Sequence, residues 1–182
     1  SARGSQQGMG VLEEVLAHKN VGNDGYKQKN YAAAIAGYTE AVKLLPVLED
    51  PNDSDNEDDC VPRSSVDPEL LKQGAIVLCN RAAAYMGDNK PIPALADAQR
   101  ASDFDPANWK GHWRTGLSLM MMKPRLERSE QAIAAFERTK VSPTLPDAER
   151  ENVNKAMAHA QYRLQEGKDS LDMPDMSNCV IA

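Results

Sequence analysis

The chain has 182 residues, of which 41% are hydrophobic and 26% charged, and its formal net charge is -6. These values are typical of a globular protein with one sizeable core and exclude a chain that is disordered throughout. The acidic balance argues against nucleic acid as the main partner, because phosphate binding requires a basic surface. Aromatic residues make up only 5% of the chain and alanine is abundant, which favours closely packed helices over a β-sandwich.

The three cysteines, Cys60, Cys79 and Cys179, are widely spaced and form no Cys-x-x-Cys pair. This pattern predicts neither a disulfide framework nor a zinc site, and it fits a reducing compartment. No apolar run approaches the roughly 20 residues that span a bilayer, and the first residues lack the apolar core of a secretory signal. We therefore expect a cytoplasmic protein, with residues 1–14 as an extension that leads into the first helix.

Two segments that lie 60 residues apart share one pattern of small residues. The shared positions are Ala34, Ala41 and Pro46 in the first segment and Ala94, Ala101 and Pro106 in the second. Alanines one or two helical turns apart allow a second helix to pack closely, and the proline ends the helix. The pattern therefore predicts closely packed helices, each stopped by a proline.

This pattern resembles the tetratricopeptide repeat, a helix-turn-helix unit of about 34 residues with small residues at the helix contact and a closing proline. The resemblance implies an all-α fold of three repeats, at about residues 15–46, 75–106 and 109–142, stacked in a right-handed superhelix. In the third repeat the turn between the helices, residues 122–129, is expected to be about four residues longer than the standard turn.

The C-terminal part of the chain is predicted to cover the last repeat. An amphipathic helix over about residues 146–166 is expected to cap the stack, because the last repeat otherwise exposes its apolar side. The tetratricopeptide domain would then span residues 15–166. Residues 167–182 are expected to form a flexible tail.

An insertion separates the first two repeats, because the offset of 60 exceeds one repeat by about 26 residues. Its acidic part, about residues 47–66, is dense in Asp and Glu and cannot bury a core, so we expect a solvated loop. Asp67 followed by Pro68 and Glu69 is typical of a helix start. The middle helix is therefore predicted to begin near Pro68 and to be unusually long.

Polar residues occur in each of the three first helices, which line the concave surface of a repeat stack. Lys19 and Asn23 are four residues apart and so share one helix face, as do Lys110 and Arg114, while Asn80 comes from the buried helix between them. The set offers three cations and two amides. It suits an extended peptide that ends in carboxylates, because charge-assisted hydrogen bonds are strong and amides add directional donors.

These residues match the two-carboxylate clamp of tetratricopeptide co-chaperones, which reads Lys-x-x-x-Asn, Asn-Arg and Lys-x-x-x-Arg in successive repeats. The resemblance implies that Lys19, Asn23 and Asn80 hold the main-chain carboxylate of a ligand's last residue. It also implies that Lys110 holds the side chain of a terminal aspartate and that Arg114 supports the peptide upstream. The expected partner is the Glu-Glu-Val-Asp tail of the cytosolic heat-shock chaperones 70 and 90.

Nothing in the sequence predicts catalysis, a metal site or a cofactor. His18, His112 and His159 are isolated, and no glycine-rich phosphate loop is present. We therefore expect a monomeric adaptor rather than an enzyme. Two alternatives stay open: the repeat half of a larger immunophilin-type peptidyl-prolyl isomerase, and a scaffold that binds an unrelated partner through its convex face or its acidic loop.

The last four residues, Cys179 to Ala182, fit the Cys-aliphatic-aliphatic-X signal for prenylation, and alanine at X favours a farnesyl group. Neither a basic cluster nor a second nearby cysteine accompanies the motif, so a single lipid predicts weak and reversible membrane association. The prediction holds only where Ala182 is the natural terminus. Recruitment of a chaperone to membranes is the implied role.

Overall fold

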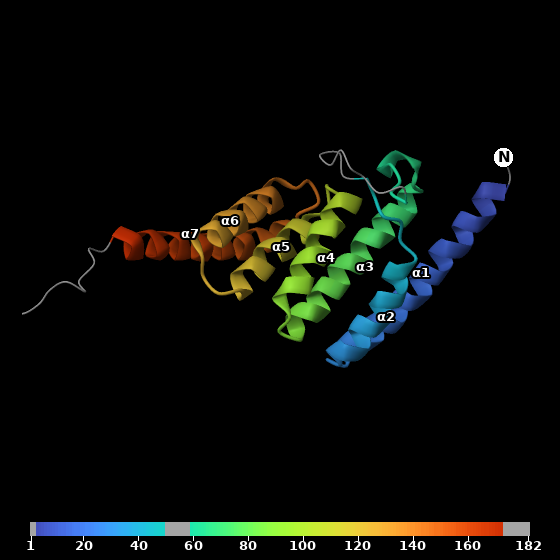
Figure 1. Cartoon of the computed structure of the whole chain (residues 1–182), viewed down its shortest axis with the longest axis horizontal. Coiled ribbons are helices and arrows are strands. Elements are labelled where there is room, and N and C mark those ends of the chain that lie inside the picture. The colour runs from blue at the N-terminus through green and yellow to red at the C-terminus, as the bar shows by residue number, and fades with distance from the viewer. Residues whose placement is uncertain (1–2, 50–58, 173–182) are drawn as a thin grey trace, which may run out of the picture.

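The computed structural model describes residues 3–49 and 59–172, and this part of the chain holds seven α-helices. They are α1 (Arg3–Lys27), α2 (Tyr31–Lys43), α3 (Pro68–Gly87), α4 (Pro91–Phe104), α5 (Trp109–Met121), α6 (Leu126–Val141) and α7 (Arg150–Asp172). Consecutive helices lie side by side along the length of the molecule (Figure 1). The predicted all-α class is confirmed: the first six helices form three pairs and α7 follows the last pair.

Local capping sets where several helices begin. The side chain of Asn30 accepts a hydrogen bond from the backbone of Ala33 at the start of α2. Asp67 accepts from two backbone N–H groups at the start of α3, and Pro68 takes the first helical position, where no N–H is needed. The predicted start of α3 is therefore confirmed, and its 20 residues exceed the 13 of α2.

Glycines allow α1 and α2 to approach until their backbones touch. A Cβ atom at Gly37 would lie 2.6 Å from the backbone nitrogen of Gly22, and one at Gly25 would lie 2.7 Å from the backbone nitrogen of Ala34. No side chain fits at either glycine without moving a helix. Ala34 and Ala41, two of the repeated alanines, are fully buried, and Ala34 is the residue that Gly25 approaches.

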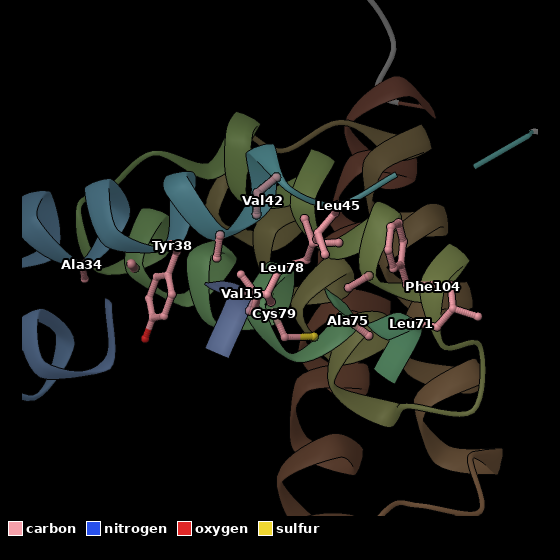
Figure 2. Close-up of a cluster of buried hydrophobic side chains, with 14 residues drawn as sticks. Val15, Ala34, Tyr38, Val42, Leu45, Leu71, Ala75, Leu78, Cys79 and Phe104 are labelled. Carbon is pink, nitrogen blue, oxygen red and sulfur yellow. The ribbon is translucent and has the colours of Figure 1, made fainter. Parts of the chain in front are cut away.

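One cluster of buried side chains joins the first four helices (Figure 2). It includes Val15 of α1, Tyr38 of α2, Leu78 of α3 and Phe104 of α4, each no more than 1% exposed. A second cluster around Phe136 joins α5, α6 and α7. Burial of each large apolar side chain contributes about 1.5–3 kcal/mol, so both clusters stabilise the stack.

The described ends of the insertion are held against the repeats. Leu48 and Val61 form an isolated parallel bridge. Arg63, in a short 3-10 helix, donates from Nε and Nη2 to the carbonyl oxygen of Phe104 at 3.2 and 3.1 Å. This carbonyl lies at the C-terminus of α4, where the last C=O groups have no N–H donor within the helix. A cation is favoured there by the helix dipole. Residues 50–58 of the predicted acidic loop lie outside the described residues.

Three helix boundaries differ from the sequence expectation. The last helix, α7, continues to Asp172, past its expected end at residue 166 and into the segment expected to form a flexible tail. The first helix begins at Arg3 rather than near residue 15, because a nucleated helix gains a backbone hydrogen bond for each added residue. The long turn expected over residues 122–129 is wrong, since α6 already begins at Leu126. A Cβ atom at Gly167 of α7 would lie 2.6 Å from Leu126, so this leucine packs against the last helix and extends α6 toward it.

The last helix covers the side of the stack that the third pair would otherwise expose. Val153 and Ala160 of α7 are fully buried. Arg163 donates from Nη1 to the carbonyl oxygen of Met120 at 2.6 Å and from Nη2 to that of Met122 at 3.1 Å. These carbonyls lie at the end of α5, so α7 both caps the stack, as predicted, and satisfies a helix terminus.

Lys29 and Asn89 adopt the same left-handed conformation in equivalent turns, with φ of 57° and 56°. A residue with a Cβ atom is strained there by about 1 kcal/mol, whereas glycine is not. We therefore expect Lys29→Gly to raise the free energy of unfolding by about 0.5–1 kcal/mol in urea denaturation. Asn89→Ala should lower it, and a Lys29→Gly protein less stable than the wild type would contradict this account.

Cys79 is 1% exposed and burial raises the pKa of its thiol to about 11, whereas Cys60 is partly exposed. Because the thiolate is the reactive form, iodoacetamide at about pH 8 should modify Cys60 and spare Cys79 in the folded protein. Both cysteines should react in denaturant. Peptide mass mapping checks this, and equal modification of both in the folded protein would contradict the burial of Cys79.

Candidate functional site

The side chain of Asn23 connects the first three helices. Its Oδ1 atom accepts a hydrogen bond from Nδ2 of Asn80 in α3 at 3.2 Å and another from the hydroxyl of Tyr38 in α2 at 2.8 Å. Burial raises the pKa of Tyr38 to about 12, so this hydroxyl stays protonated and donates at neutral pH. Figure 2 shows the Tyr38 hydroxyl at the edge of the core cluster, pointing away from its other members.

A cavity of about 230 Å³ lies at this junction. Its lining residues are Asn23, Tyr26, Lys27, Tyr38, Asn80, Ala83 and Arg114. Three of the five predicted site residues therefore share one cavity, with one residue from each of α1, α3 and α5. Lys19 and Lys110 do not line it.

Arg114 gives the cavity a positive charge from the α5 side. Its Nε atom is buried and has no hydrogen-bond partner within the part of the chain that the structure describes. Burial raises the pKa of the neighbouring Cys79 thiol, and the charges of Arg114 and Lys110 oppose that rise. Both cations therefore act on the stretch of α3 that carries Asn80.

Lys19 and Lys110 each lie one helical turn before a residue that lines the cavity, Asn23 and Arg114. Nζ of Lys19 donates to Oε1 of Gln73 at 2.7 Å. Lys110 is exposed, one helical turn before Arg114, and its Nζ lies 5.9 Å from the centroid of the Trp109 ring. None of the ion pairs between described residues involves Lys19, Lys110 or Arg114.

The hydrogen bonds within the site occupy acceptor atoms and leave several N–H donors available for a ligand. The oxygen of Asn23 already accepts twice, so its amide N–H groups are what it can offer a ligand. Gln73 occupies one of the three N–H donors of Lys19. No carboxylate lines the cavity among the described residues. Such a set of donors suits an anion, above all a carboxylate, because charged N–H donors bind it strongly.

Sequence reasoning missed several residues of this site. Lys27 lines the cavity and follows Asn23 by four residues, a helical spacing that could have revealed it. Gln73 precedes Asn80 by seven residues and so lies on the same face of α3. Tyr38 is both buried and bonded to Asn23, a contact between residues 15 apart that no motif indicated.

Arg81, which follows Asn80, supports the fold rather than the cavity. It donates from Nε and Nη2 to the carboxylate of Asp97 at 2.7 and 2.6 Å, and from Nη1 to Thr39 at 3.2 Å. Asp97 is only 5% exposed. Loss of one partner from a buried ion pair costs about 3–5 kcal/mol, because the other charge then stays buried without a partner, so replacing Arg81 or Asp97 alone should loosen the contact of α3 with α4.

No group of three or more His, Cys, Asp or Glu residues within residues 3–49 and 59–172 is placed to hold a metal ion. None of the described helices combines the length and the apolar character needed to cross a bilayer. Cys179, the predicted lipidation site, lies outside the described residues.

No family model matches the chain. Small glutamine-rich tetratricopeptide repeat-containing protein 2 of Saccharomyces cerevisiae is 28% identical over 139 residues, which are 76% of this chain and 30% of that protein. The DnaJ homolog subfamily C member 7 homolog of Dictyostelium discoideum is 27% identical over 127 residues, which are 70% of this chain and 19% of that protein. The chain thus spans less than a third of the length of either relative.

Solved tetratricopeptide (TPR) domains share the fold. The Arabidopsis OM64 TPR domain has a TM-score of 0.56 and 27% identity, covering 86% of this chain and 98% of that domain. The TPR2B domain of yeast Sti1, in its pHsp70 complex, has a TM-score of 0.60 and 15% identity, covering 83% of this chain and 98% of that domain. The first TPR of Spaghetti (RPAP3), bound to the HSP90 peptide SRMEEVD, has a TM-score of 0.53 and 20% identity, covering 88% and 95%. The chain therefore has the fold of tetratricopeptide-repeat domains and is similar in sequence to the OM64 domain and to the two relatives above.

Proposed function

We propose that the chain is a co-chaperone adaptor that binds the Glu-Glu-Val-Asp tail of cytosolic heat-shock chaperones of the 70 or 90 family. The observation that carries this proposal is the donor-lined cavity shared by Asn23, Asn80 and Arg114. Further support comes from two domains of the same fold, of Sti1 and RPAP3, whose structures contain pHsp70 and an HSP90 peptide.

Each predicted residue has a role in this proposal. Lys19, Asn23 and Asn80 bind the main-chain carboxylate of the last ligand residue, the two asparagines through the N–H groups that their mutual bond leaves available. Lys110 binds the side-chain carboxylate of the terminal aspartate, and Arg114 binds the peptide further upstream. A hydrogen bond to a charged group contributes about 1.5–3 kcal/mol, part of which offsets the ordering of the peptide.

The cavity also has an apolar wall. Ala83 and the rings of Tyr26 and Tyr38 lie in the same lining as the two asparagines. This surface suits an aliphatic side chain next to the terminal residue, such as the valine of the proposed tail. Full burial of that side chain adds about 1.5 kcal/mol or more, so shape and charge together would select the ligand.

Calorimetric titration with a peptide ending in Glu-Glu-Val-Asp tests the proposal. We expect micromolar affinity, about -8 kcal/mol. Amidation of the peptide C-terminus or Lys110→Ala should weaken binding by about tenfold or more, because each removes a charge-assisted hydrogen bond. Lys123→Ala removes the same charge from an exposed turn away from the cavity lining and should bind as the wild type does.

Two results would contradict the proposal. Equal affinity for the acid and amide forms of the peptide would show that the terminal carboxylate is not recognised. Absence of binding by the wild type would favour the scaffold alternative, in which another surface binds an unrelated partner and the five residues take no part.

We further propose that Cys179 accepts a farnesyl group where Ala182 is the natural end of the protein. Farnesyltransferase with farnesyl diphosphate should then add one lipid to the wild type and none to Cys179→Ser, as measured by mass spectrometry. A single lipid would give reversible vesicle binding. An unmodified wild type, or a lipid retained by the Cys179→Ser variant, would rule this modification out.

A further inference from the structure

A chain of polar contacts runs from the first turn of α3 to the proposed site. Nε2 of Gln73 donates to Oε1 of Glu69 at 2.8 Å. Oε1 of Gln73 accepts from Nζ of Lys19 at 2.7 Å, a partly buried contact between residues 54 apart in the chain. Because its nitrogen is bonded to Glu69, Gln73 presents its oxygen to the lysine.

This contact continues the one between Asn23 and Asn80. Lys19 lies one turn before Asn23 in α1, and Gln73 lies two turns before Asn80 in α3. From the first contact to the second, the residue numbers rise along both helices, so α1 and α3 run parallel here. Together they form a polar seam between α1 and α3 that leads away from the cavity.

We propose that Gln73 is a positioning residue that holds Lys19 ready for a carboxylate ligand, an inference that rests on the proposed function. Lysine has a long flexible stem, and ordering such a side chain only on binding weakens affinity by about two- to tenfold. Gln73 orders it beforehand. The ammonium keeps two further N–H donors for the ligand.

A neutral amide suits this role better than a carboxylate would. A carboxylate at position 73 would pair with Lys19 and cancel the charge that attracts an acidic ligand. The chain instead places its carboxylate one turn earlier in α3, at Glu69, where it accepts a hydrogen bond from the amide of Gln73. Lys19 thus gains a fixed partner and keeps its charge.

The insertion contributes to this arrangement. Gln73 precedes the second repeat as expected from the sequence, residues 75–106, and belongs to the early turns of α3. Asp67 caps that start, and Arg63 fixes the preceding segment to the carbonyl oxygen of Phe104. The segment that interrupts the repeats therefore ends in the helical turns that hold Lys19.

A double-mutant cycle with a Glu-Glu-Val-Asp peptide tests the inference. Gln73→Met removes the hydrogen bond and nearly keeps the side-chain length; it should weaken binding about three- to tenfold. The double variant with Lys19→Met should bind as weakly as Lys19→Met alone, within about twofold, because Gln73 acts through Lys19. Lys72→Met, at the adjacent exposed position, should change affinity by less than about twofold.

Three results overturn the inference, and they are distinguishable. Wild-type affinity in Gln73→Met shows that Gln73 has no role, with the proposed function intact. An equal loss in the Lys19→Met background shows that Gln73 acts independently of Lys19. A wild type that does not bind the peptide removes the proposed function and this inference together. Matching thermal unfolding curves of all variants exclude loss of fold as the cause of weaker binding.

Discussion

The geometry of the site depends on one oxygen atom, Oδ1 of Asn23. It accepts hydrogen bonds from Tyr38 at 2.8 Å and Asn80 at 3.2 Å, and so connects α1, α2 and α3. An oxygen that already has two donors cannot turn toward a ligand without leaving both of them unpaired. The amide is therefore fixed with its N–H groups available, and the cavity offers donors rather than acceptors.

That junction exists because small residues bring the helices close. Gly22 immediately precedes Asn23, and a Cβ atom there would collide with the ring of Tyr38. A Cβ atom at Gly37 would meet the backbone of Gly22. Any larger residue at either position would push α1 away from α2 and lengthen the bond between Tyr38 and Asn23, which weakens steeply with distance and angle. Packing between backbones thus sets the direction of a polar group in the cavity.

The parts of this structure that could be predicted from sequence are those with a local or periodic cause. The start of α3 follows from Asp67 and Pro68, two neighbouring residues with capping chemistry. Helical spacing likewise indicated Asn23 and Arg114, and the resemblance to the clamp added Asn80. All three line one cavity. The start of α6 was missed because it depends on Leu126 packing against α7, much later in the chain. The bond of Lys19 to Gln73 was missed because it joins residues 54 apart that belong neither to the repeat pattern nor to the clamp motif as a pair.

The central claim is that the amide groups of Asn23 and Asn80 receive the terminal carboxylate of a peptide. The most direct test is an NMR titration that follows their side-chain N–H signals with a Glu-Glu-Val-Asp peptide and its amidated form. The account predicts that both signals shift with the acid, stay in place with the amide at equal concentration, and leave the exposed Asn152 unchanged. Peptide that binds while both signals stay in place would contradict it.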